Sequence, residues 1–258
     1  MAEDKVEERL EERRFGGVSR LYGPELRERF RNASVVVAGL GGVGSWAAEA
    51  LVRTGIGHLV LVDFDHIAES NTNRQLHAFE GQYGKAKVEA MTQRILQINP
   101  EIKLTPCDEF LTPENLDQLI PQDAYVLDAT DSVQTKIALS VWANQNHRSL
   151  VMCGAAGGKT DPTSVRCDDL SRTEQDALLA KVRQGLRQDH GFSRNLKKKI
   201  GIRAIYSQEP RAGAATGGLA CSGYGSTVMV TAACGLAAAA EILNLIAANS
   251  LPSSTSSI

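Results

Sequence analysis

Apolar residues in the first 155 positions of the chain fall into two kinds of pattern. Short runs that are mostly apolar occupy residues 35–38, 58–62, 124–128 and 150–153, and a short strand is also expected at 102–105. Stretches with helical periodicity lie around them, at 24–31, 45–53, 84–98, 113–119 and 133–146. A run without alternation is typical of a strand buried on both faces of a parallel sheet. This order of strands and helices predicts an α/β fold with a doubly wound, mostly parallel sheet of the Rossmann-like type.

The pattern changes after residue 155. We expect strands at 163–167 and 202–206, a helix at 173–188, a glycine- and alanine-rich loop at 209–225, and an apolar helix at 227–248. We therefore assign residues 15–155 to a core and residues 156–250 to an extension that completes the same domain. Residues 1–14 and 251–258 are expected to be frayed or disordered.

The apolar stretch near the C-terminus is short for a membrane span. It runs for 13 residues, from Val228 to Ala240, before Glu241 interrupts it, whereas a transmembrane helix needs about 20. A buried helix or a helix at a subunit interface is the better prediction, and membrane association beyond a weak peripheral contact is not expected.

Composition and charge limit the class of protein. The chain has 258 residues, 43% of them hydrophobic and 22% charged, as in globular proteins. Its net charge of −2 gives no overall attraction to nucleic acid, so RNA or DNA would need a local patch. Five cysteines without any C-x-x-C pair argue against a disulfide framework and against a common zinc site. The charged N-terminus is not that of a signal peptide, so we predict the cytoplasm.

Four glycines follow the first apolar run and precede a helix. Gly39 permits a tight turn, Gly41 and Gly42 let the backbone approach a phosphate, and Gly44 lets the helix pack closely on the strand. Asp63 ends the next strand, where a carboxylate can hold ribose hydroxyls. This unit predicts a nucleotide site but is compatible with ATP, NAD or FAD.

Further polar residues follow the ends of the predicted strands. Residues 64–75 form a polar segment that is long for a link between a strand and a helix, and such loops are often functional. Lys85 and Lys87 open the next helix, and Asp131 follows the strand at 124–128. Because the carboxyl ends of parallel strands meet at one edge, these groups are expected to face one crevice.

These motifs, in this order, resemble the adenylating domain of ubiquitin-activating-like enzymes, a family that includes bacterial activators of sulfur-carrier proteins. The resemblance rests on Arg20, the glycine run, Asp63-x-Asp65, and residues 70–75, 84–88 and 129–131. The Arg-Phe-Gly-Gly start at 14–17, the basic insert at about 187–203 and the alanine-rich C-terminal helix are most similar to a branch that acts on tRNA. Members of that branch use ATP to cyclise a threonylcarbamoyl group on an adenosine beside the anticodon.

The resemblance implies ATP, Mg²⁺ and a homodimer. A carboxylate would attack the α-phosphate to give an acyl-adenylate, and a nitrogen of the same substrate would then displace AMP. Carried over by position, the candidate catalytic residues are Arg20 from the partner subunit, Arg74, Lys87 and the metal-binding Asp131. The candidate nucleotide-binding residues are Gly39, Gly41, Gly42, Gly44, Asp63, Asp65, Asn71, Asn73, Arg74, Lys87, Asp131 and Ser132. No zinc is expected, and the sequence leaves open whether a monovalent cation binds.

A basic segment supplies candidate RNA contacts. Residues 194–203 carry five basic side chains and no acidic one, a composition that can neutralise RNA phosphates. The candidate RNA-contacting residues are Arg187, Arg194, Lys197, Lys198, Lys199 and Arg203.

Each candidate also has a simpler structural explanation. Asp131 or Ser132 can cap a helix that starts at residue 133. Asn71 and Asn73 can serve a turn, Lys87 can be a surface lysine, and the basic segment can be a solvated loop. Only the ordered combination favours the ATP site.

The cysteines are not placed in the catalytic set. Cys234 falls in the apolar helix, where a free cysteine is usually a small core hydrophobe. It remains the second choice for sulfur chemistry, because the family is linked to a cysteine desulfurase and its sulfur acceptor.

Two rival functions remain open at this stage. One is an adenylyltransferase for a ubiquitin-like sulfur carrier, against which the missing zinc cysteines and the basic insert argue. The other is a nucleotide-binding scaffold for sulfur-transfer partners, against which the complete polar set argues.

Overall fold

The computed structural model describes residues 13–210 and 224–249. A helical segment at 13–22 precedes the remaining helices, which are α2 (Pro24–Asn32), α3 (Gly44–Thr54), α4 (Lys87–Ile98), α5 (Leu116–Leu119), α6 (Val133–Gln145), α7 (Ala177–Asp189) and α8 (Val228–Ala248). The strands are β1 (Ser34–Ala38), β2 (His58–Val62), β3 (Lys103–Cys107), β4 (Tyr125–Asp128), β5 (Leu150–Cys153), β6 (Val165–Asp169) and β7 (Arg203–Ser207).

All seven described strands form one sheet in the order β3-β2-β1-β4-β5-β7-β6. Every neighbouring pair is parallel except β6 and β7, which are antiparallel. The chain moves outward from β1 to β3 and then returns to place β4 on the other side of β1. This reversal opens a crevice at the carboxyl ends of β1 and β4. The predicted doubly wound, mostly parallel α/β fold is confirmed.

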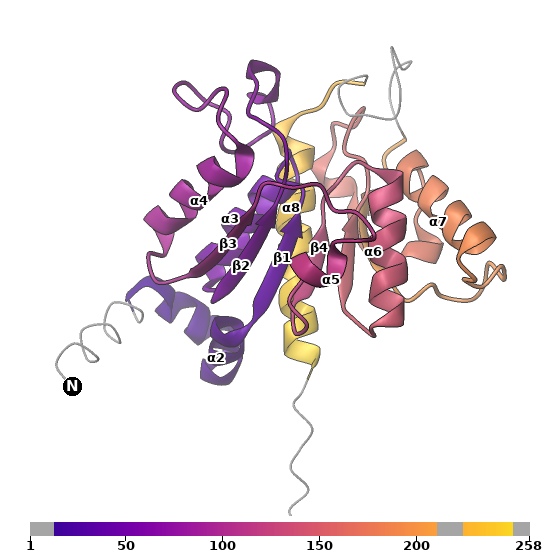
Figure 1. The fold of residues 1–258 in the computed structure, drawn as a ribbon, viewed down its shortest axis with the longest axis horizontal. Helices are drawn as coiled ribbons and strands as arrows, with labels where there is room; N and C mark the ends of the chain where they lie inside the picture. The colour runs from indigo at the N-terminus through magenta and orange to yellow at the C-terminus, as the bar shows by residue number, and fades with distance from the viewer. Residues whose placement is uncertain (1–12, 211–223, 250–258) are drawn as a thin grey trace, which may run out of the picture.

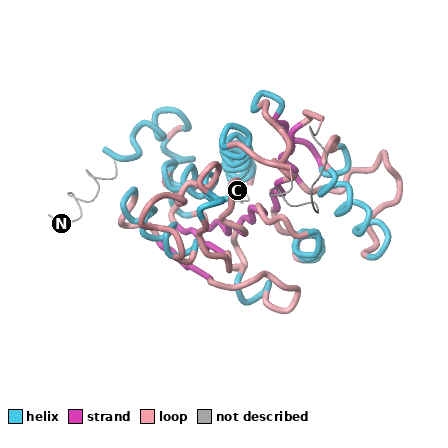
Figure 2. The backbone as a smooth tube through the Cα atoms, turned by 90° about the horizontal axis from the view of Figure 1, so that it is seen from above, coloured by secondary structure: helices cyan, strands magenta, loops and turns pink. Residues whose placement is uncertain are grey.

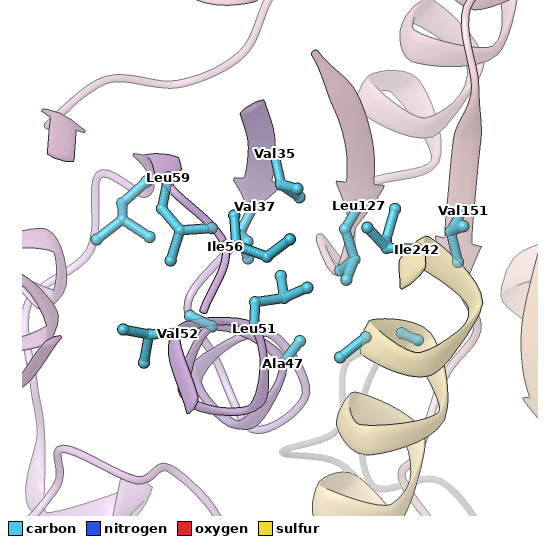
Figure 3. Close-up of a cluster of buried hydrophobic side chains, with 14 of the residues drawn as sticks. Val35, Val37, Ala47, Leu51, Val52, Ile56, Leu59, Leu127, Val151 and Ile242 are labelled. Carbon is cyan, nitrogen blue, oxygen red and sulfur yellow. The ribbon is translucent and has the colours of Figure 1, made fainter. Parts of the chain in front are cut away.

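Helices cover both faces of this sheet (Figures 1 and 2). One core contains residues of β1, α3, α4 and α8, and the other contains residues of β4, α6 and α7. Figure 3 shows Leu51 of α3 and Ile242 of α8 directed toward Val37 and Leu127 of the sheet. Since each fully buried aliphatic side chain stabilises the fold by about 1.5–3 kcal/mol, coverage of both faces explains why the central strands β1, β2, β4 and β5 are mostly apolar runs.

The C-terminal helix α8 is part of the first core. By length and composition α8 is apolar enough to cross a membrane, since its most apolar 18-residue stretch has a mean hydropathy of 1.8. However, half of this stretch is buried inside the protein. Gly235 lets it approach α3 closely, because a Cβ there would lie 2.4 Å from the Val43 carbonyl oxygen. Glu241, the acidic residue within α8, pairs with Arg203 of β7 at 2.6 Å. The helix is therefore explained by packing against α3 and the sheet.

Several element boundaries differ from the predictions because turns and caps occupy the first expected residues. Residues 84–86 precede α4 rather than open it, since Gly84 has a φ of +83°. A short 3-10 helix at Pro162–Ser164 delays β6, and Asp176 caps α7, so α7 begins four residues later than expected. Arg20 lies in the helical segment 13–22. The predictions for residues 1–12, for most of the 209–225 loop and for the tail lie outside the described residues.

Candidate functional site

A pocket of about 290 Å³ lies at the carboxyl ends of β1, β2, β4 and β5. The residues that line it include most of the candidates from the sequence: Gly39, Gly41, Gly42, Asp63, Asp65, Asn71, Arg74, Lys87, Asp131 and Ser132. The expected crevice therefore exists, and residues separated by more than 90 positions share it.

The glycine turn forms the floor of the pocket. Gly39 has a φ of +84°, which a residue with a side chain rarely adopts. A Cβ on Gly44 would lie 1.8 Å from the Gly39 carbonyl oxygen, so the turn closes only because this position has no side chain. No side chain caps the first turn of α3, and no acidic residue lies in it. Its free N–H groups and the helix dipole can therefore attract the phosphates of a nucleotide.

Asp63 is fixed beside this turn by the backbone. Its carboxylate accepts hydrogen bonds from the N–H groups of Leu40 at 2.5 Å and Asp65 at 2.8 Å. Burial raises the pKa of Asp63, although Lys87 and these N–H groups act in the opposite direction. The carboxylate is thus oriented before any ligand binds, as a ribose-binding group needs to be.

Lys87 is a buried lysine and not a surface one. Its side chain is 6% exposed, and Nζ donates to Asp65 Oδ2 at 2.7 Å, while Asp63 Oδ1 lies 3.9 Å away. An ammonium buried between two carboxylates at the wall of a pocket can bind a phosphate group by turning away from one of them.

His77 is a buried neutral histidine next to Lys87. It is 1% exposed, and neither ring nitrogen has a hydrogen-bond partner among the described residues. Burial and the charge of Lys87 lower the pKa of His77 to about 4. The imidazole is therefore uncharged at neutral pH and adds no second positive charge beside Lys87.

The stability of the protein is expected to fall as the pH drops from about 6.5 to 4. In this range the unfolded imidazole binds a proton and the folded one does not, so protonation favours unfolding by up to roughly 3 kcal/mol. Urea unfolding midpoints of His77→Leu should depend less on pH than those of the wild type. The variant of the exposed His190, His190→Gln, is the control. If the wild type and His77→Leu lose the same stability between pH 6.5 and pH 4, the lowered pKa of His77 is not the cause of the pH dependence.

Arg74 is held in place by neighbours in the polar segment. Its Nη1 donates to the Ser70 carbonyl oxygen at 2.7 Å and to Asn73 Oδ1 at 2.9 Å. Asn73 does not line the pocket, and its Nδ2 donates to the Ser226 carbonyl oxygen at 2.8 Å. Asn71 does line the pocket, although its Oδ1 also accepts from the Ala68 N–H. The two asparagines therefore have different positions: Asn71 faces the ligand space and Asn73 orients Arg74.

Asp131 and Ser132 also differ. Ser132 caps α6, because its Oγ accepts from the Thr135 N–H at 3.2 Å. Asp131 is exposed in the pocket and has no hydrogen bond or ion pair with another described residue. Helix capping thus explains Ser132 and leaves the Asp131 carboxylate available for a metal ion. No group of three or more metal-ligating side chains occurs in the described ranges, but Mg²⁺ usually needs only one or two carboxylates beside phosphate oxygens.

An aromatic pair lies at one end of the pocket and was not expected from the sequence. The rings of Phe64 and Phe110 lie with centroids 4.5 Å apart, and both residues line the pocket while exposed. Such a surface can stack on a purine. The only local signal is that Phe64 lies between Asp63 and Asp65, because Phe110 comes from a distant loop.

The opposite end of the pocket was also missed. It is lined by residues 154–156 and by Leu178 of α7, whereas Thr231 of α8 lines the pocket beside Gly42 of the glycine turn. Asp176 fixes this end, since its Oδ2 accepts from the Ala155 N–H at 2.8 Å and its Oδ1 caps α7.

The remaining candidates lie away from the pocket. Arg20 is exposed on the helical segment 13–22 and does not line the pocket of its own chain. The side chains of Arg194 and of residues 197–199 are exposed in the loop after α7, near the amino end of β7. Arg203 is different, because its guanidinium pairs with Glu241.

Cys153 and Cys234 are buried in the core between the sheet and α8. Burial raises the pKa of the Cys153 thiol, so a thiolate is disfavoured there. Neither thiol lines the pocket, and core packing accounts for both.

Known proteins resemble this chain over nearly its whole length. The model of the ThiF family matches residues 16–257. The tRNA threonylcarbamoyladenosine dehydratase of Escherichia coli strain K12 is 44% identical over 246 residues, which cover 89% of this chain and 92% of that protein. The crystal structure of the E. coli tRNA N6-threonylcarbamoyladenosine dehydratase in complex with ATP has a TM-score of 0.85 and covers 92% of this chain and 95% of that one.

An adenylyltransferase relative matches less of the chain. The molybdopterin-synthase adenylyltransferase of Salmonella typhimurium strain LT2 is 37% identical over 116 residues, or 45% of this chain and 47% of that protein. That likeness therefore leaves more than half of this chain unmatched.

Proposed function

The chain belongs to the ThiF family, and from this premise we propose that it is an ATP-dependent enzyme that dehydrates threonylcarbamoyladenosine in tRNA. The dehydration closes a ring within the modified side chain. The observation that carries the proposal is the pocket, which combines anion-binding amides, an oriented acid, two cationic side chains and a free carboxylate.

ATP fits this pocket in one direction. Its adenine lies against Phe64 and Phe110, its ribose hydroxyls bind Asp63, and its phosphates lie over the glycine turn at the start of α3. Lys87 and Arg74 then bind the triphosphate, and Asp65 releases Lys87 as it does so. Asp131 would hold Mg²⁺, and the ion would neutralise charge on the phosphates.

The substrate carboxylate enters from the other end of the pocket, beside residues 154–156 and Leu178. An oxygen of the carboxylate attacks the α-phosphorus, and the bond to pyrophosphate breaks. A nitrogen of the same side chain then attacks the activated carbonyl, and AMP leaves. Because this second step is intramolecular, the enzyme needs mainly to orient the groups and to exclude water.

RNA binding is assigned to the basic segment at residues 194–199 together with Arg187. The exposed side chains of Arg194, Lys197, Lys198 and Lys199 can neutralise phosphates. Arg203 leaves this set because Glu241 already neutralises it.

The proposal includes a homodimer, in which Arg20 of each subunit reaches the phosphates bound by the other. A partner is needed for this role because Arg20 does not line the pocket of its own chain. Interaction with a cysteine desulfurase system and binding of a monovalent cation remain additional proposals of the family resemblance. A cytoplasmic location follows from action on tRNA.

A turnover assay tests the proposed function. The protein is incubated with ATP and Mg²⁺ and with either threonylcarbamoylated tRNA, unmodified tRNA or a carrier protein ending in Gly-Gly, and AMP release is measured. We expect release only with the threonylcarbamoylated tRNA, together with a mass loss of one water from the modified nucleoside.

Other outcomes favour the rival functions. Release only with the carrier protein would assign the chain to the adenylyltransferases, whose similarity covers less of it. ATP binding without release under any condition would indicate a nucleotide-binding scaffold.

A further inference from the structure

The surface formed by α6, α7 and the loops that follow them has almost no acidic residues. Residues 133–149 and 177–202 contain a single acidic residue, Asp189, although acidic residues occupy 30 of the 258 positions in the chain. The same two stretches contain the basic segment, Lys181, Arg187 and Arg148. We call this the α6–α7 surface. It differs from α2 and α4, which carry acidic residues in their first turns.

The α6–α7 surface is continuous from one end of the sheet to the other. At the carboxyl ends of the strands, Thr135 of α6 and Leu178 of α7 line the ATP pocket. In the middle the two helices touch, since a Cβ on Gly185 would lie 2.5 Å from Ile137 Cδ1. At the amino ends, Arg148 and Phe192 line a second pocket of about 180 Å³ beside the basic segment.

The ATP pocket and the basic segment are separated by about the length of α7. The 13 residues of α7 rise by about 20 Å along the helix axis. In Figure 1, α7 slopes down along the right-hand side of the molecule into the orange loop that follows it, which contains the basic segment. A stem-loop of RNA can therefore contact both ends of the surface at once.

The charges favour RNA on this surface rather than around the mouth of the ATP pocket. The pocket is lined by Asp63, Asp65, Glu109 and Asp131, which repel phosphates that are not bound to a cation. On the α6–α7 surface, by contrast, Lys181 and Gln184 are exposed. Arg187 is half-buried beside them, and its Nε and Nη2 atoms have no acceptor among the described residues, so no described acidic side chain neutralises its charge.

We propose that the α6–α7 surface is the path along which tRNA lies between the ATP pocket and the basic segment. This inference rests on the proposed function, and it adds the route of the RNA backbone. The reacting adenosine leaves the stack to enter the pocket, and the backbone that follows it runs along Lys181 and Arg187 to Lys197, Lys198 and Lys199.

Charge-reversal variants test this path. Lys181→Glu and Gln184→Glu place an acid in the middle of the surface, and neither residue lines the ATP pocket. Lys103→Glu is the matched control, because Lys103 is exposed on β3 at the opposite edge of the sheet. Binding of labelled threonylcarbamoylated tRNA is measured by fluorescence anisotropy over a range of salt concentrations, and ATP binding is measured by calorimetry.

We expect Lys181→Glu to raise the Kd for tRNA by about tenfold or more at low salt, and Gln184→Glu by several-fold. In Lys181→Glu, the plot of log association constant for tRNA against log salt concentration should be less steep by about 0.7–0.9, the value for one lost phosphate contact. Lys103→Glu should bind tRNA like the wild type, and all three variants should bind ATP normally.

The path is wrong if Lys181→Glu and Gln184→Glu bind tRNA as tightly as Lys103→Glu does, or if they lose ATP affinity in parallel with tRNA affinity. Failure of the proposed function gives a different result, because wild-type protein would then release no AMP with threonylcarbamoylated tRNA.

Discussion

Gly44→Ala is expected to destabilise the protein by about 3 kcal/mol or more and to abolish measurable ATP binding. A methyl group there would lie 1.8 Å from the Gly39 carbonyl oxygen and 2.9 Å from its carbon. Because both atoms belong to the backbone, no side-chain rotation can relieve the overlap. The turn between β1 and α3 must therefore open, and we expect the free-energy cost to lie at the upper end of the range for overpacked sites, about 3 kcal/mol. This is a large part of the roughly 5–15 kcal/mol that stabilises a domain.

Gly41→Ala is the matched variant, since the nearest atom to a Cβ there is Gln75 Nε2 at 4.0 Å. It should keep a urea midpoint close to that of the wild type and still weaken ATP binding, because the methyl group enters the space of the phosphates. Urea unfolding and calorimetric ATP titration of both variants separate the effects. A Gly44→Ala protein with wild-type stability and ATP affinity would show that the turn is not packed as described.

Asp131→Asn is expected to lower the rate of AMP release by roughly 10³-fold, with the folded state intact. Removal of one preorganised group that stabilises developing charge typically costs about 10²–10³-fold in rate, and a neutral amide oxygen binds Mg²⁺ more weakly than a carboxylate does. Asp131 is exposed and unpaired among the described residues, and Ser132 supplies the helix cap, so little structure depends on the carboxylate.

The rate is measured as AMP release with threonylcarbamoylated tRNA at increasing Mg²⁺ concentrations. Asp108→Asn is the control, because Asp108 is exposed nearby and does not line the pocket. If Asp131→Asn shows the same rate and the same Mg²⁺ dependence as the control, Asp131 has no metal-binding role.

Pairs of neighbouring residues show which roles the sequence could not assign to individual side chains. Position 131 or 132 was expected either to cap α6 or to bind a metal, and the structure assigns the cap to Ser132 through a contact three residues away. Asn71 and Asn73 were both expected at the nucleotide. The second instead binds the Ser226 carbonyl oxygen, 153 positions along the chain. A sequence window shows neither choice, because side-chain direction depends on what the rest of the chain places nearby.

The sequence by itself determined the α/β fold, the glycine turn and the order of polar residues that meet at one crevice. These features follow from local rules: a strand buried on both faces must be apolar throughout, and a tight turn against a helix must lack side chains.

The tertiary structure alone decided which distant residues complete the site. The contact of Phe64 with Phe110, the pairing of Arg203 with Glu241 and the position of the basic segment at the opposite end of the sheet depend on strand order and helix packing. The physical reason is that helices, strands and turns depend on hydrogen bonds and side chains within a few residues. Contacts between residues far apart in the chain depend instead on how both helical layers pack on the sheet.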